Sequence, residues 1–145
     1  MSPATNSAIL DGSFRTSIPG IFSCGKVPQV YDVVDFAPLE SEKAGVAAAV
    51  WAMTGKLPEP VIKMNAGAGL RYVLPATISS QDNVDFTMRP WTEEHDKSVV
   101  LKNGGEVLRR LMMPHMEPAG TIRIRVDKGR FKHVVNNEIT AEIED

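Results

Sequence analysis

The residue types that could carry out chemistry unaided are sparse in this chain. Cys24 is the single cysteine, and the three histidines stand at positions 95, 115 and 133. A nucleophilic thiol needs a base or cationic surroundings that lower its pKa, and no histidine lies close to Cys24 in sequence. These four residues do not have the spacing of a zinc or haem site. The sequence therefore predicts no catalytic residue and no metal ligand, and it favours a small buried side chain as the role of Cys24.

Gly67 and Gly69 form a second candidate site, for phosphate. Glycines at this spacing open the dinucleotide fingerprint, in which the backbone approaches a pyrophosphate at a helix N-terminus. The third glycine of that fingerprint would fall at Tyr72, and residues 70–75 form a strand-like run ended by Pro75. A glycine-rich β-turn is therefore favoured over a phosphate site.

The elements that would position a site differ between the two halves of the chain. In the first half, the apolar run 18–23 predicts a short buried strand, and a helix is expected over residues 38–54. Pro38 suits a first helical turn and Gly55 suits a C-cap. The large apolar side chains of this helix share one stripe at helical spacing, formed by Leu39, Val46, Val50 and Met53. Small residues cover much of the remaining surface, which permits close approach by a strand or a ligand.

A domain boundary is expected near residue 58, because Pro58 and Pro60 block helix continuation. This boundary divides the chain into residues 1–57 and 58–145. Seven short apolar or alternating segments follow it, at residues 61–64, 70–74, 84–88, 98–102, 107–112, 121–126 and 138–143. Such segments with turn signals between them are typical of a small antiparallel β-sandwich. The predicted fold class is α+β, with short strands and one helix before the sandwich.

Residues 16–25, TSIPGIFSCG, are followed by a loop and by a helix that carries Gly45 and Ala47 to Ala49. This arrangement resembles the C-terminal FAD motif of the FAD-dependent pyridine nucleotide-disulfide oxidoreductase superfamily. The resemblance implies that residues 1–57 are the C-terminal segment of an FAD-binding domain. It also implies flavin contacts at Gly25, Lys26, Phe36 and Ala37, with the helix start facing the pyrimidine edge of the flavin. Lys26 stands where the superfamily usually has an acidic residue that accepts a hydrogen bond from the ribityl chain.

The runs 31–36 and 40–45 are similar to one branch of that superfamily, the dehydrogenases with a small β-rich extension after the flavin domain. In that branch a phrase like residues 69–75, GLRYVLP, opens the extension. The chain has no helix-initiating Gly-x-Gly-x-x-Gly unit and no redox cysteine pair. The resemblance therefore implies the C-terminal fragment of a flavoprotein oxidoreductase, which is not catalytic alone. In the parent enzyme, FAD would mediate electron transfer with a nicotinamide nucleotide, NAD or NADP.

Composition sets the remaining expectations. The chain has 145 residues, 43% of them hydrophobic, and a formal net charge of -2, which excludes a disordered tail and argues against a nucleic-acid-binding surface. No apolar run approaches the length of a membrane span, no signal peptide is recognised, and the lone cysteine favours the cytoplasm. The expected partner is the remainder of the flavoenzyme or a partner subunit, with a homo-oligomer as a further option. The alternative function is a non-catalytic interaction module whose β-sandwich docks a partner subunit through exposed strand edges.

Overall fold

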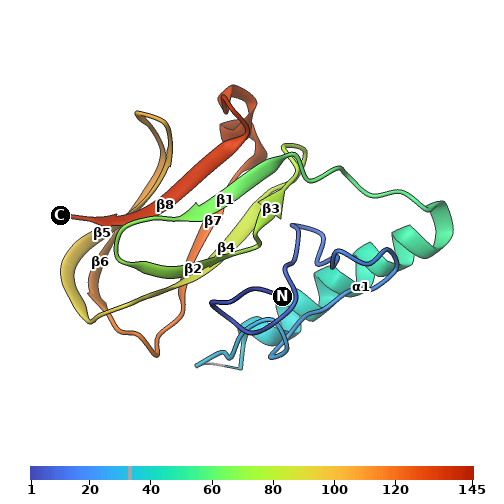
Figure 1. The fold of residues 1–145 in the computed structure, drawn as a ribbon, viewed down its shortest axis with the longest axis horizontal. Helices are drawn as coiled ribbons and strands as arrows, with labels where there is room; N and C mark the ends of the chain where they lie inside the picture. The colour runs from blue at the N-terminus through green and yellow to red at the C-terminus, as the bar shows by residue number, and fades with distance from the viewer. Residues whose placement is uncertain (33) are drawn as a thin grey trace.

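The structure is a computed structural model that describes residues 1–32 and 34–145. Helix α1 precedes all the strands, and a 3₁₀ helix precedes the last one (Figure 1). The elements are α1 (Phe36–Thr54), β1 (Ile62–Ala66), β2 (Leu70–Leu74), β3 (Thr77–Ile78), β4 (Val84–Pro90), β5 (Glu94–Asn103), β6 (Glu106–Met116), β7 (Ile122–Val126), η1 (Lys128–His133) and β8 (Glu138–Glu144). The α+β class is confirmed, with strands dominating.

The strands form two sheets. One has the order β3-β1-β8-β5-β6, and the other has the order β2-β4-β7. All pairs are antiparallel except β1 and β8, which run parallel. The expectation of a purely antiparallel sandwich is therefore wrong at this pair. Alternation of apolar residues defines the faces of a strand and not its direction, so the sequence pattern carried no signal for the parallel pair.

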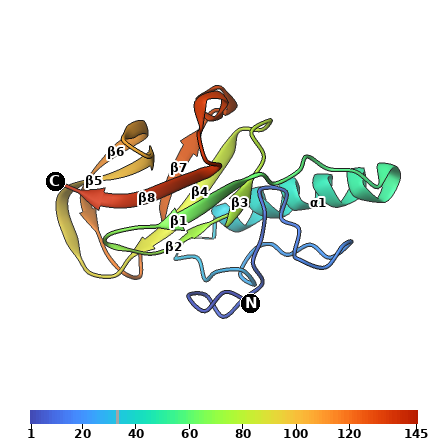
Figure 2. The same cartoon turned by 45° about the horizontal axis from the view of Figure 1, so that its top comes forward.

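The hydrophobic core lies between the two sheets, which overlap in both views (Figures 1 and 2). Its members come from residues 62–141, and Phe86, Met88 and Leu101 are fully buried. Phe131 of η1 closes one end and meets Phe86 edge to face, with ring centroids 6.5 Å apart. Among the described residues, those of 1–57 contribute no side chain to this core cluster.

Helix α1 begins two residues before the expected start and ends where predicted. Gly55 adopts φ +65°, and its N–H donates to the Trp51 carbonyl at 2.8 Å, which confirms the C-cap. Three of the four residues of the predicted apolar stripe, however, face outward: Leu39, Val46 and Met53 are 45%, 62% and 78% exposed, and the fourth, Val50, is half-buried. Ala44 is the buried residue of the helix. Gly45, Ala49 and Ala52 are exposed, so only part of the small-residue surface packs against the rest of the chain. Within the described residues, no helix has the length and apolar character that crossing a membrane requires.

Residues 14–23 form a small hairpin-like turn and not the expected buried strand. Ile21 N–H donates to the Ile18 carbonyl at 3.1 Å, and Gly20 adopts φ +81°. Arg15 and Phe22 form an isolated antiparallel bridge across this turn. Pro19 and Gly20 therefore reverse the chain in the middle of the apolar run, and Ile18 and Ile21 are left 58% and 49% exposed.

Candidate functional site

The loop that follows the turn at residues 14–23 places Gly25 beside the first turns of α1, which include Ala37. Gly25 and Ala37 are two of the four expected flavin contacts. Gly25 has φ +67°, and a side chain added to it would lie 3.8 Å from Ser41 Oγ. Ser41 Oγ in turn donates to the Ala37 carbonyl at 2.8 Å. Gly25 therefore lies beside the first turns of the helix. Lys26, the next residue, is exposed.

Phe36 anchors the start of the helix to the sandwich. Its half-buried ring lies 5.1 Å from the guanidinium carbon of Arg123 on β7 and 6.1 Å from the Tyr31 ring. Ala37 N–H donates to the Val34 carbonyl at 3.2 Å, and Asp35 makes no side-chain cap. The Phe36 side chain is thus occupied by protein contacts, and a ligand at this helix start would meet the backbone.

A small ionic cluster lies between α1 and the three-stranded sheet. Lys43 of α1 hydrogen-bonds Asp85 of β4, and Arg123 Nη2 lies 3.2 Å from Asp85 Oδ2. Burial favours the neutral acid at Asp85, but its hydrogen bonds and charge interactions with Lys43 and Arg123 outweigh burial and lower its pKa. Glu40, one helical turn before Lys43, responds in the opposite way, because burial raises its pKa. Burial and the neighbouring Glu40 carboxylate also raise the pKa of Tyr31.

A buried glutamine connects residues 1–57 to the same sheet. Gln29 Nε2 donates to the Tyr31 hydroxyl at 2.8 Å and to Thr87 Oγ1 at 2.6 Å. Gln29 Oε1 accepts from the Tyr72 hydroxyl at 3.1 Å. Both amide donors and the amide acceptor are therefore used. Sequence reasoning missed this network, since its members are up to 58 residues apart and no local pattern marks Gln29.

The hollow beside these polar groups is too small for a flavin. Its volume is about 60 Å³, and Phe36, Glu40, Lys43, Asp85 and Arg123 are among the residues that line it. This volume accommodates a few water molecules, whereas sites for drug-sized ligands span about 300–1,000 Å³. A flavin would have to lie on the exposed side of residues 25–37.

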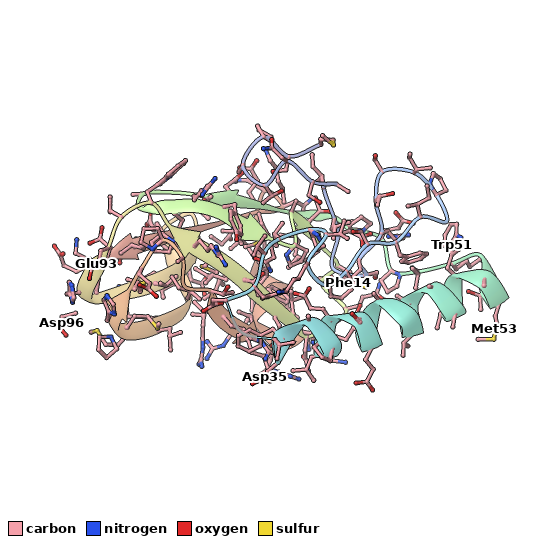
Figure 3. The ribbon with its side chains drawn as sticks, turned by 90° about the horizontal axis from the view of Figure 1, so that it is seen from below. Phe14, Asp35, Trp51, Met53, Glu93 and Asp96 are labelled. Atoms are coloured by element: carbon pink, nitrogen blue, oxygen red, sulfur yellow. The ribbon has the colours of Figure 1, made fainter. Side chains whose placement is uncertain are left out.

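Residues 1–57 expose an unusual amount of apolar surface. Among the described residues, ten of the fifteen exposed large hydrophobic side chains belong to this segment. We call these ten the N-terminal apolar surface: Met1, Ile9, Ile18, Ile21, Val27, Val30, Val34, Leu39, Val46 and Met53. Ile9, Ile18 and Ile21 line an open groove of about 540 Å³. Figure 3 shows Met53 projecting from the far end of α1.

The remaining chemistry-bearing residues are distributed differently from the sequence expectation. Cys24 is a free thiol and is half-buried rather than buried. His95 and His115 come together on neighbouring strands β5 and β6, with Glu93 beside them. The two histidines are 20 residues apart in sequence because they lie on the two strands of the β5–β6 hairpin. The Asn-Gly-Gly turn at residues 103–105 was the sequence signal that could have predicted their pairing.

Comparison with known proteins returned no similarity: no family model, curated protein or solved structure matches this chain.

Proposed function

We propose that this chain is the C-terminal part of an FAD-dependent oxidoreductase that exchanges electrons with a nicotinamide nucleotide. Residues 1–57 would complete the flavin domain, and residues 58–145 would form a β-sandwich extension. The observation that carries the proposal is the N-terminal apolar surface. It lies on the segment that resembles the end of a flavin domain, and it lies outside the sandwich core.

The outward-facing apolar side chains of α1 support the proposal that another part of the flavoenzyme packs on this helix. Most helical stability in proteins comes from packing of an apolar face, yet Leu39, Val46 and Met53 all face outward. Exposed apolar side chains that gather in one place mark an interaction site, and Ile9, Ile18 and Ile21 gather at one groove. We assign the cover to the nucleotide-binding remainder of the flavin domain, whose sheet would pack on α1.

The residues present fit one edge of a flavin. Gly25 has no side chain between the loop and the first turns of α1, and Lys26 is exposed beside it. Phe36 and Ala37 would border the flavin at the helix start, where the partial positive charge suits an electron-rich acceptor atom. Ala37 N–H already donates to the Val34 carbonyl, so Ala37 would contribute close approach and not a hydrogen bond. When bound, FAD would supply the redox chemistry itself. The role of these residues is to hold and orient it.

The alternative, a non-catalytic interaction module, rests on a different surface. β6 is an edge strand of eleven residues, and Val107 and Met112 on it are 43% and 61% exposed. An edge strand offers unpaired backbone groups to a partner strand. Location of the partner contact therefore separates the two functions: the remainder of a flavin domain contacts α1, and an augmenting strand contacts β6.

Amide chemical-shift mapping with FAD tests the proposed flavin contact. A chain of 15.8 kDa suits this measurement, which detects the weak binding expected of a partial site. FAD should shift the amide signals of Gly25, Lys26, Phe36 and Ala37 and leave those of Gly104 and Gly105 unmoved. If millimolar FAD moves no signal in residues 25–37, or moves only distant ones, the flavin assignment is wrong.

Lys26→Glu provides a directional test of the same contact. A carboxylate at this position can accept a hydrogen bond from the ribityl hydroxyls, which lysine cannot do. The substitution should tighten FAD binding about tenfold, equivalent to about 1.4 kcal/mol, although it adds negative charge near an anionic ligand. Lys56→Glu makes the same charge change in the exposed linker and should not tighten binding. Equal effects of the two substitutions would contradict the ribityl contact.

A further inference from the structure

A three-residue cluster with metal-ligand chemistry lies at the open end of the β5–β6 hairpin. His95 of β5 and His115 of β6 are directly opposed in the strand register. Their rings stack with centroids 4.7 Å apart and planes 18° apart. Glu93 precedes β5, and its Oε1 lies 2.9 Å from His115 Nε2 and 3.3 Å from His95 Nε2. All three side chains are exposed, so an ion can reach them from solvent.

We propose that Glu93, His95 and His115 bind a divalent transition-metal ion through Glu93 Oε1 and the two Nε2 atoms. One ligand atom from each residue lies within 4.8 Å of the others. Tetrahedral zinc bonds of about 2.0–2.1 Å place neighbouring ligand atoms roughly 3.3 Å apart, close to the separations between the carboxylate and the two imidazoles. Small side-chain rotations would therefore complete the site, with water in the fourth position.

The pairing of β5 with β6 already places two of the three ligand side chains next to each other. The antiparallel pairing of β5 and β6 holds the two imidazoles side by side, and both point an Nε2 atom at the same carboxylate oxygen. An ion bound among the three would satisfy both imidazoles and the carboxylate together.

The ligand set defines the class of metal. Two imidazoles and one carboxylate suit Zn²⁺, Ni²⁺ and Cu²⁺, whereas Mg²⁺ and Ca²⁺ prefer oxygen ligands alone. Glu93 lies at one end of the molecule, away from Asp35 at the start of α1, where the proposed flavin contacts Phe36 and Ala37 lie (Figure 3). The turn at residues 103–106 joins β5 and β6 at one end, and the ion would tie their other, open ends together. This site is thus separate from the proposed flavin contact.

Calorimetric titration of the full chain, prepared without a histidine tag, tests the proposal. Zn²⁺ and Ni²⁺ should bind with one-to-one stoichiometry, and Mg²⁺ should give no binding. His95→Ala and His115→Ala should each weaken Zn²⁺ binding at least tenfold, and Glu93→Gln should weaken it measurably. His133→Ala removes an exposed histidine of η1 outside the cluster and should leave binding unchanged.

Cu²⁺ quenching of tryptophan fluorescence locates the ion independently. Trp91 is 62% exposed and two residues from Glu93, whereas Trp51 lies on α1. In a Trp51→Phe background, Cu²⁺ should quench the remaining fluorescence saturably, and His115→Ala should abolish that saturable phase. A Trp91→Phe chain should show no saturable quenching. The proposal is overturned if no saturable phase appears at millimolar metal, or if His95→Ala and His115→Ala bind Zn²⁺ as tightly as the unmodified chain.

Discussion

Asp85 of β4 and Glu40 of α1 are carboxyl groups on facing elements. Their pKa values show that contacts with cations decide whether a partly buried carboxyl has a raised or a lowered pKa. Burial alone favours the neutral acid in both. Asp85 meets two cations, Lys43 and Arg123, and its pKa is lowered despite its burial. At Glu40, the hydrogen bond from Tyr31 and the charges of Lys43 and Arg123 offset burial only in part, so its pKa stays raised. The two groups should therefore contribute to the pH dependence of stability with opposite signs.

Asp85→Asn should destabilise the folded chain by about 1 kcal/mol at neutral pH, since Lys43 and Arg123 are partly exposed and lose only their ion pairs. The folded-state pKa of Asp85 lies below its unfolded value, so its contribution is complete above about pH 4 and is lost as the pH falls below that. Urea unfolding at a series of pH values should show the variant and the unmodified chain converging in acid. A gap that stays constant down to acid pH would contradict this assignment.

Glu40→Gln should have the opposite effect. The folded-state pKa of Glu40 lies above its unfolded value, so ionisation opposes folding as the pH rises above about 4 and through the folded-state pKa. The neutral amide removes that cost, and the variant should gain stability relative to the unmodified chain between acid and neutral pH. The same urea series measures this gain. A loss of stability that grows with pH would mean that Glu40 is stabilised by its cationic neighbours after all.

Residues that act through their immediate neighbours in sequence were predictable, and residues that act across the fold were not. The Gly55 cap is local, and it was placed correctly. Gln29 bonds Thr87 across 58 residues, and Lys43 bonds Asp85 across 42. Nothing near these residues in sequence records such contacts. The pairing of His95 with His115 was missed for the same reason, because it exists only once β5 and β6 align.

For helices and strands too, features set by local sequence signals were predictable. The seven predicted strand segments all contain strands, since apolar alternation and turn residues are local signals. β3 was missed because it has two residues, too few for a pattern. The buried strand expected at residues 18–23 failed because Pro19 and Gly20 reverse the chain there. For α1 the position was predictable, but its packed side was not: Ala44 is buried, whereas the large apolar residues Leu39, Val46 and Met53 are exposed.

Adjacent positions in α1 test which face of the helix is packed. Gly45 is exposed and a side chain added there would meet nothing within 4 Å, so Gly45→Ala should stabilise the chain by about 0.5–1 kcal/mol through helix propensity. Ala44 is 4% exposed, and Ala44→Leu should destabilise it by about 1–3 kcal/mol through overpacking. Chemical unfolding of both variants measures these changes. Destabilisation by Gly45→Ala would show that another part of the chain closes on that face.

At the scale of the whole molecule, the structure has a complete core on one side of residue 58 and an attached segment on the other. Within the part of the chain that the structure describes, every member of the core cluster lies in residues 62–141. Residues 1–57 are held to it by the Gln29 network, by Arg15 Nη2 donating to the Pro58 carbonyl at 2.9 Å, and by backbone bonds from residues 10–12 to the β3 region. The division into residues 1–57 and 58–145 stays a prediction that unfolding experiments can address.

Residues 58–145 alone should fold cooperatively, because their core needs no side chain from the attached segment. We expect dispersed amide signals and a single unfolding transition, with stability reduced because Tyr72 and Thr87 lose Gln29 and the β3 edge is uncovered. Phe86→Ala in the full chain is the matched control. It leaves residues 1–57 in place but removes a fully buried ring, which should cost about 3–5 kcal/mol. If the truncated chain gives collapsed, poorly dispersed signals while Phe86→Ala stays folded, then residues 1–57 are part of the folding unit, and the N-terminal apolar surface belongs to a single domain rather than to a segment awaiting its own cover.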